Sequence, residues 1–290
     1  MTRRRDVERN LAGLQEIRAI LDAMRNLAVL ETRKIARFRD AHRRSLHTLA
    51  VAAADVARYH APALRTTRRM TVWILVGSER GFCGDLNETL LAAWQAQRSE
   101  VEKSHPREGG DPVPVTVVGS RLAARLPDGE SVQALAGPSI AEDVNEVIVR
   151  LADALRARLE REPGAALDLA VLHHEPDMVV PQLARLEPFP EPTTDAPGTP
   201  PQLDLPPEAL LPELGEQHLL AQLQAVLYAA LAAENEKRLR HMDAAIRRLD
   251  EDSARLTVQR NRLRQEEITE EIEVIMLSVE RLRAAGGRRP

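Results

Sequence analysis

Residues 77–87, GSERGFCGDLN, place several chemically useful residue types close together. A thiolate beside a cation can act as a nucleophile, and Cys83 lies three residues from Arg80. The motif specifies no base for it, so we interpret Cys83 as a small buried residue in a tight strand-to-helix turn, with a thiol enzyme as an alternative. The glycines could cradle a phosphate, but neither G-x-x-x-x-G-K-[ST] nor G-x-G-x-x-G is present. The sequence therefore predicts no direct nucleotide binding and no cofactor.

His173, His174 and Glu175 form a second cluster, at the end of a predicted strand. Imidazole and carboxylate groups are metal ligands, but adjacent side chains of a strand point to opposite faces. The chain has one Cys, which excludes a disulfide framework and a multi-Cys zinc site. We therefore expect a structural role for this cluster and predict no metal site.

A polar band lies near the C-terminus, where an apolar helical stripe changes phase. It consists of Arg262, Arg264, Gln265, Glu266, Glu267, Glu270 and Glu271. It is either a solvated helix face or a band that a surrounding partner binds, since long donors on a rigid helix can engage carboxylates from several directions.

Positive charge is concentrated at the N-terminus. Residues 1–45 contain twelve Lys or Arg and six Asp or Glu, although the whole chain has a net charge of -4. A basic helix can bind nucleic acid or an anionic membrane, but it can also flank a coiled coil or contact an acidic protein. No aromatic platform accompanies these charges, so the sequence predicts no nucleic-acid partner.

The helix breakers divide the chain into parts that must position these groups. Residues 14–61 and 216–285 contain neither Gly nor Pro, whereas 18 of the 19 prolines lie between Pro62 and Pro212. Pro breaks helices and Gly weakens them, so both ends are predicted to be long helices. We predict a helix at 1–62, an α/β domain at 68–190, a Pro-rich loop at 191–207 and a helix at 208–290.

Both predicted helices carry apolar stripes at coiled-coil spacing. In the first, apolar residues recur every seventh position from Val7, with partner positions predicted three residues further on, as at Ile17 and Phe38. Between the helices, three apolar runs (70–76, 113–118 and 166–173) alternate with helical stretches, which indicates a parallel sheet. The predicted fold is a long antiparallel two-helix coiled coil with a small parallel-sheet, Rossmann-like α/β domain between its helices.

The low aromatic content of 2% agrees with long helices rather than one globular core. No apolar run approaches the roughly 18 residues of a membrane-spanning helix, and the Arg-rich start lacks the apolar centre of a signal peptide. The sequence therefore predicts a cytoplasmic protein.

Three segments of the chain together resemble the gamma-subunit family of F-type ATP synthases. Residues 77–87 are similar to the family's S-D-R-G-L-C-G-G-L-N turn, with matches at Arg80, Gly81, Cys83, Gly84, Leu86 and Asn87 and differences at Glu79, Phe82 and Asp85. Residues 20–34 resemble a helix of the family, with matches at Ala23, Met24, Ala28, Arg33 and Lys34. Residues 264–275, RQEEITEEIEVI, resemble R-Q-x-x-I-T-x-E-[IL]-x-E-I, with Val274 in place of an acid. The differences suggest a divergent or alternative F-type branch.

The resemblance implies a non-catalytic central rotor subunit. Its implied partners are the alpha and beta subunits of the F1 ring, the epsilon subunit and the membrane c-ring, with a location on the inner face of the bacterial cell membrane. It also implies that Arg264 and Gln265 bind a loop of the beta subunit. Further rotor contacts are implied for Met24, Arg33, Lys34, Ile268, Glu271, Ile272 and Ile275, and a structural turn for Arg80, Gly81, Cys83, Gly84 and Asn87.

The alternative from another class is a coiled-coil adaptor or signalling module with an α/β head. Unlike a rotor subunit, such a module does not need exposed apolar residues at the end of its coiled coil, and it would form a self-contained homo-oligomer. The sequence leaves open the coupling ion and the direction of the reaction.

Overall fold

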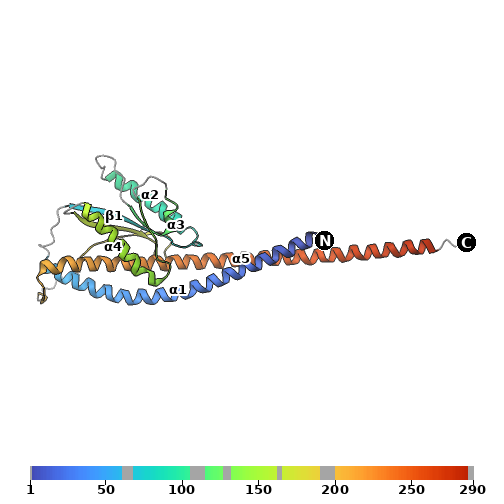
Figure 1. Cartoon of the computed structure of the whole chain (residues 1–290), viewed down its shortest axis with the longest axis horizontal. Coiled ribbons are helices and arrows are strands. Elements are labelled where there is room, and N and C mark those ends of the chain that lie inside the picture. Colours follow the sequence, from blue (N-terminus) through green and yellow to red (C-terminus); the bar gives the residue numbers. More distant parts are fainter. Residues whose placement is uncertain are drawn as a thin grey trace. The chain divides into compact units, whose positions relative to one another are not determined.

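The computed structural model describes residues 2–60, 68–104, 115–126, 132–161, 165–189 and 200–286. These residues form two compact units. One combines Met1–Leu27 with Met242–Pro290, and the other is Ala28–His241. The long helices α1 (Thr2–His60) and α5 (Pro207–Gly286) each contribute a part to both units (Figure 1). Residues 191–199 of the predicted Pro-rich loop lie outside the described residues.

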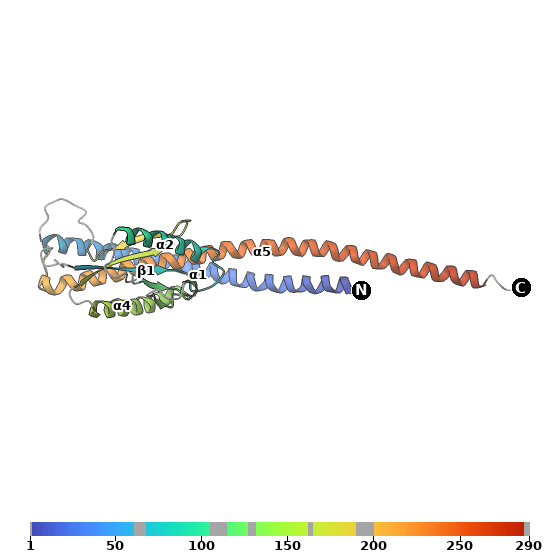
Figure 2. The same ribbon diagram turned by 90° about the horizontal axis from the view of Figure 1, so that it is seen from above.

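The first unit, which we call the helix pair, consists of the start of α1 and the end of α5. The two helices run antiparallel, because Arg4 contacts Glu267 at 3.1 Å whereas Arg18 contacts Asp250 at 2.6 Å. Val7, Leu11, Leu21, Met242 and Ile246 are buried between them. Figure 2 shows the two helices alongside each other. This arrangement confirms the predicted antiparallel pair.

One side of the predicted α1 seam is displaced by a residue. The positions every seventh residue from Val7 are buried or half-buried, but the predicted partner positions Ile17 and Phe38 are 50% and 37% exposed. The next residue in each heptad is buried or half-buried instead, as at Leu11 and Arg18 respectively. The partner positions were predicted wrongly because an Arg can pack its aliphatic stem over a seam while its charged group reaches a carboxylate. A search for apolar residues alone does not find such a position.

The second unit, which we call the sheet unit, is built on a five-stranded sheet. Its strands are β1 (Arg68–Val76), β2 (Val115–Val118), β3 (Val132–Leu135), β4 (Ala165–His173) and β5 (Gln182–Leu186). Their order is β3-β2-β1-β4-β5, and all neighbours are parallel except β4 and β5, which are antiparallel. The parallel core of the sheet is therefore as predicted.

The apolar pattern of the sequence did not predict β3 and β5, the two edge strands. They are four and five residues long, and most of their residues are at least partly exposed. Strands buried on both faces form continuous apolar runs, whereas short edge strands do not. That difference explains why only the three central strands were predicted.

Helices cover both faces of the sheet (Figure 1). On one face, α2 (Leu86–Ser104) and α3 (Ser120–Ala123) enclose a core in which the rings of Trp73 and Trp94 lie 5.0 Å apart. On the other face, α4 (Val144–Arg161), the 3-10 helix η2 (Ala141–Asp143), and the parts of α1 and α5 in this unit pack together. Here Ile35 of α1 is fully buried among residues of the sheet, α4 and α5. The parts of α1 and α5 in this unit are thus components of its core.

Candidate functional site

The end of α5 forms a bare helical tip, which we define as residues 268–281. Each of these residues is exposed, and α5 continues past the start of α1 within the helix pair (Figures 1 and 2). The large apolar residues exposed on the tip are Ile268, Ile272, Val274, Ile275, Met276, Leu277 and Val279. Contiguous exposed apolar surface of this kind usually marks a contact with another molecule.

The polar band is also exposed, except for the half-buried Glu267, which pairs with Arg4. Arg264 and Gln265 both face solvent, as does Glu271 further along. Arg262 donates to Glu266 at 2.9 Å, one helical turn away. The long polar side chains of Arg264 and Gln265 are therefore accessible from outside the helix pair.

The predicted contact residues of α1 have different environments. Met24 is half-buried in the helix pair, while Arg33 is exposed in the sheet unit. Lys34 forms ion pairs with Glu142 of η2 and with Glu31, and the hydrogen bond to Glu142 raises the pKa of Lys34. Lys34 thus already has carboxylate partners in its own chain.

The predicted turn follows β1 and leads into α2. Asn87 closes it by donating to the hydroxyl of Ser78 at 2.8 Å and accepting the backbone N–H of Ser78 at 3.0 Å. Gly84 has a φ of 60°, in the left-handed region that favours glycine. Among the described residues, no atom would lie within 4 Å of a Cβ added at Gly81, and Arg80 is exposed. The geometry therefore accounts for Gly84 and Asn87, and it offers no steric reason for Gly81.

The thiol of Cys83 is buried beneath this turn. Its sulfur lies 3.3 Å from the backbone oxygens of Arg80 and Gly81, either of which can accept the single S–H. Burial, together with the negative charge of Glu234, raises the pKa of Cys83 to about 12. A thiol with this pKa stays protonated near neutral pH, and a protonated thiol is a poor nucleophile.

Two residues of α5 that the sequence analysis did not select form a buried ion pair against the turn. Arg238 donates to the carboxylate of Glu234, and the two residues are only 5% and 4% exposed. A Glu and an Arg four residues apart normally indicate a solvated helix face. The available signal was the surrounding apolar run, since Leu231 and Ala233 directly precede the pair.

His173 and His174 lie at the end of β4 and are almost fully buried. The Nε2 atom of His174 lies 3.1 Å from the backbone oxygen of Leu86, and Nδ1 of His173 lies 3.2 Å from the oxygen of His174. Burial lowers the pKa of both rings, that of His174 to about 4. Among the described residues, no group of three or more His, Cys, Asp or Glu side chains is arranged to hold a metal ion.

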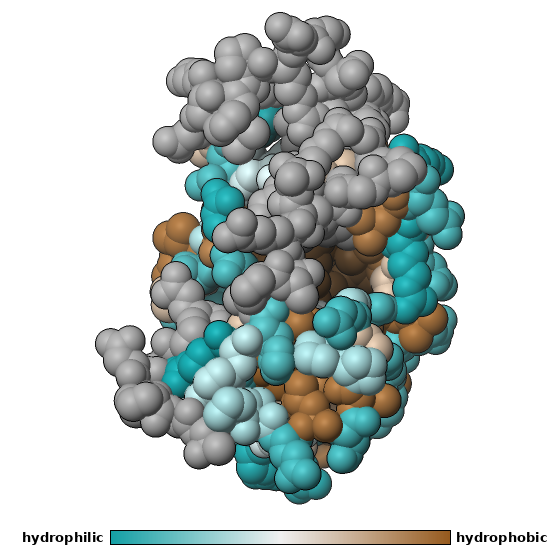
Figure 3. All heavy atoms as spheres, turned by 90° about the vertical axis from the view of Figure 1, so that its left-hand side faces the viewer, coloured by the Kyte–Doolittle hydropathy of each residue, from teal (hydrophilic) through white to brown (hydrophobic). Residues whose placement is uncertain are grey.

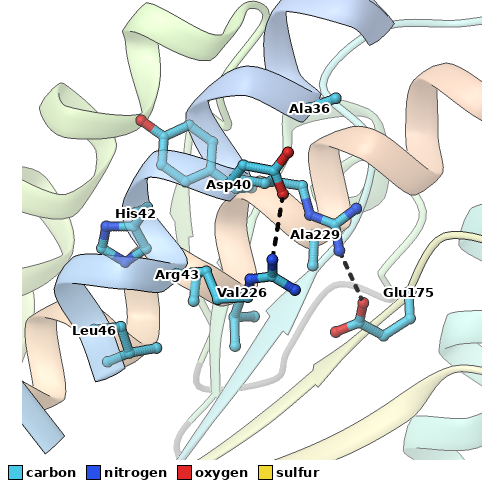
Figure 4. A pocket seen from close by; sticks show the side chains of 11 residues that line it. Ala36, Asp40, His42, Arg43, Leu46, Glu175, Val226 and Ala229 are labelled. Carbon is cyan, nitrogen blue, oxygen red and sulfur yellow. Dashed lines mark ion pairs between the residues drawn. The ribbon is translucent and has the colours of Figure 1, made fainter. Parts of the chain in front are cut away.

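A groove of about 360 Å³ lies between α1 and α5 in the sheet unit (Figure 4). Arg39 pairs with Glu175 at 3.8 Å and Arg43 with Asp40 at 3.9 Å, while Nε2 of His42 lies 2.8 Å from the oxygen of Ala221. The charged groups of the groove are therefore paired with one another.

A second hollow, of about 400 Å³, lies between α4 and the start of α5, and its lining is mainly apolar. Phe189 and Leu219 contribute to that lining, and Arg156 and Glu216 form an ion pair beside it. Figure 3 views the end of the unit where α5 begins and shows apolar residues between polar ones.

Across the described parts of the chain, no helix has the length and apolar character needed to cross a membrane.

Comparison with known proteins identifies relatives across nearly the whole chain. The model of the family described as ATP synthase matches residues 3–282. The rotor of the Euglena gracilis mitochondrial ATP synthase in rotational state 1 contains a chain with 13% identity and a TM-score of 0.59, covering 92% of this chain and 99% of that one. The OSCP/F1/c-ring structure of the same enzyme in rotational state 3 contains a chain with 14% identity and a TM-score of 0.65. That match covers 100% of this chain and 97% of the other.

At identities of 13% and 14%, the solved structures show a shared fold alone. The family model, which matches residues 3–282, shows that the chain is also related to this family in sequence. A comparison with curated proteins gives no match. The shared fold extends over the long helices as well as the sheet, because the second structure covers the full chain.

Proposed function

The chain belongs to the gamma-subunit family of ATP synthases, and we propose that it is the central shaft of a rotary F-type enzyme. In this role it transmits torque between a ring of alpha and beta subunits and a membrane c-ring. It thereby couples ion translocation to the synthesis or hydrolysis of ATP.

The bare tip of α5 is the observation on which this proposal rests. Residues 268–281 expose aliphatic side chains and contain no aromatic residue. Short aliphatic side chains make many weak contacts without interlocking, which suits a helix that must turn against a surrounding ring. The antiparallel partner α1 supports the same helix below the tip and would stiffen it.

Arg264 and Gln265 are proposed to bind a loop of the beta subunit. Both are exposed at the base of the tip, and a guanidinium can form charge-assisted hydrogen bonds that are stronger than neutral ones. We propose Ile268, Glu271, Ile272 and Ile275 as ring contacts of the tip, and Met24, Arg33 and Lys34 as contacts of α1. For Lys34 such a contact requires exchange with its bond to Glu142.

The remaining assignments are parts of the same proposal. The chain is a subunit of an ATP synthase complex, and we propose that it has no catalytic group of its own. The segment 68–190 would rest on the epsilon subunit and the c-ring, residues 1–62 and 208–290 would form the shaft, and residues 191–207 would connect them. The proposed location is peripheral, at the inner face of a bacterial cell membrane.

Truncation tests the role of the tip. A chain that ends at Gln265 lacks the exposed tip but keeps the residues of the sheet unit, so we expect the sheet unit to fold and coupling to be impaired. The measurement is ATP-driven ion pumping by the complex reconstituted with its alpha, beta, epsilon and membrane subunits. Unchanged pumping would contradict the proposal.

Charge reversal tests the proposed loop contact separately. Arg264→Glu should lower turnover of the assembled complex without affecting folding, because Arg264 is exposed. Arg264→Lys keeps the charge and serves as the matched control, with a smaller loss expected. Normal turnover of the Glu variant in a complete complex would remove Arg264 from the proposed contact.

A further inference from the structure

The strand order defines a particular place at the edge of the sheet. β1 lies between β2 and β4, so the chain moves outward from β1 on one side through β2 and β3, and on the other side through β4 and β5. In open sheets of this order, ligands bind outside the carboxyl ends of the strands at the point where the order reverses. The turn after the first strand supplies backbone N–H groups to an anionic group of the ligand. In this chain that turn is residues 77–85, between β1 and α2.

A carboxylate of the chain itself lies against this turn. The backbone N–H groups of Glu79 and Arg80 donate to Oε2 and Oε1 of Glu234, each at 3.3 Å. Successive N–H groups that converge on one anion form the concave arrangement known as a nest. The sulfur of Cys83 also lies 3.8 Å from Oε1 of Glu234. The turn therefore binds an anion, and that anion is a side chain of α5.

A buried cation completes the arrangement. Arg238 donates through Nη2 to Oε1 of Glu234 and through Nε to the backbone oxygen of Gly81 at 3.2 Å. Leaving a charge buried without a partner is costly, so Glu234 and Arg238 depend on each other. Burial raises the pKa of Glu234, while the charge of Arg238 and the N–H groups of the turn oppose that rise.

A second carboxylate occupies the neighbouring strand ends. Glu79 accepts the backbone N–H of Ser120 at 2.8 Å and that of Gly137 at 2.7 Å, directly after β2 and β3. The backbone N–H groups of Ser120 and Gly137 are thus satisfied by an acidic side chain of the same chain.

We propose that the turn after β1, together with Arg238, is a binding site for a small carboxylate anion, and that Glu234 occupies it as an internal ligand. The bound side chain fills the position that a nucleotide phosphate takes in sheets of this order, and it joins α5 to the carboxyl edge of the sheet. This site does not depend on the proposed shaft function, because all its groups lie within the sheet unit.

Rescue by formate tests the proposal in the full-length chain. Glu234→Ala removes the carboxylate and leaves the N–H groups and Arg238 without their partner, so it should lower the thermal midpoint of the sheet unit. Trp73 and Trp94, the only tryptophans, both lie in that unit, so their fluorescence reports its unfolding. Sodium formate at about ten times its dissociation constant should raise the midpoint of this variant by about 3–5 °C relative to sodium chloride of equal ionic strength.

Three controls separate occupation of the site from a general salt effect. Glu234→Gln fills the space with an amide and should not respond to formate, and Glu216→Ala removes an exposed carboxylate of the same helix and should not respond either. Glu234→Ala combined with Arg238→Ala lacks the cation and should lose the rescue. If Glu234→Ala is unfolded in chloride, recovery of native fluorescence on adding formate becomes the readout. No rescue in either assay, or equal rescue in the single and double variants, would overturn the proposal.

Discussion

Acid should destabilise the sheet unit through His174, and replacing this residue should reduce the loss of stability. Nε2 of His174 can donate to the oxygen of Leu86, which leaves the buried Nδ1 as the atom that a second proton must occupy. No acceptor for a proton on Nδ1 lies within the described residues, and the nearby charge of Lys237 also disfavours an imidazolium. The hydroxyl of Thr89 also lies 3.1 Å from Nε2, but it has carbonyl acceptors for its own hydrogen in Asp85 and Leu86. The carbonyl of Leu86 can only accept, so we assign the proton of the neutral ring to Nε2.

The magnitude follows from the pKa of His174, which burial lowers from 6.5 to about 4. The unfolded chain therefore binds a proton at this residue before the folded chain does. Stability is complete above pH 6.5, falls as the pH decreases below that value, and has lost about 3 kcal/mol near pH 4. The environment of His173 acts in the same direction, because burial lowers its pKa as well.

Urea unfolding at several pH values between 7 and 4, followed by tryptophan fluorescence, measures this loss for the sheet unit. His174→Gln can retain the donor to Leu86 without a titrating ring, so its stability should fall less steeply over this range than that of the unchanged chain. His47→Gln, an exposed residue of the same unit, is the matched control and should keep the original slope. Parallel pH profiles for the unchanged chain and His174→Gln would refute the reasoning.

Three further substitutions test other parts of the structure. Gly13→Ala should stabilise the helix pair by about 1 kcal/mol, because Gly13 lies in α1 with no described atom within 4 Å of an added Cβ; a lower midpoint in the helical circular dichroism melt would contradict this. Gly119→Ala should destabilise the sheet unit by at least about 1–3 kcal/mol, because its φ is 119° and a Cβ would lie 2.7 Å from the oxygen of Gly77. Gly81→Ala, whose Cβ would meet no described atom within 4 Å, is the control. Equal melting midpoints of the two variants, measured by tryptophan fluorescence, would contradict the expected clash at Gly119. Cys83→Ala should leave the ATPase activity of the assembled complex near that of the unchanged chain, since the thiol is buried and protonated; complete loss in an intact complex would revive a nucleophilic role.

The sequence predicted those elements whose own residues carry a strong pattern. α4 is one of the helical stretches predicted between the apolar runs, because its buried residues recur at helical spacing, as at Val144, Val147 and Leu151. The same reasoning failed for β3, whose four residues have no run of buried positions. It also failed for one side of the α1 seam, where the half-buried Arg18 pairs with Asp250 of α5.

The exposed tip was accessible from the sequence, whereas the buried pair beneath the turn was not. The resemblance to the family implied rotor contacts for Ile272 and Ile275, and both residues are exposed on the tip. Glu234 and Arg238, by contrast, have the spacing of an ordinary surface pair. Their role depends on the position of the turn after β1 in space, and no local pattern encodes that position.

The antiparallel pairing of α1 and α5 determines when the chain can fold during its synthesis. The contact between Arg18 and Asp250 joins residues 232 positions apart. A ribosome therefore completes nearly the whole chain before the start of α1 meets its partner, and until then the apolar residues of α1, such as Leu11 and Leu21, lack the helix that buries them. Contacts of such separation form slowly, and apolar surface exposed in the meantime promotes aggregation. We therefore expect the nascent chain to require protection of its first helix until α5 has been made.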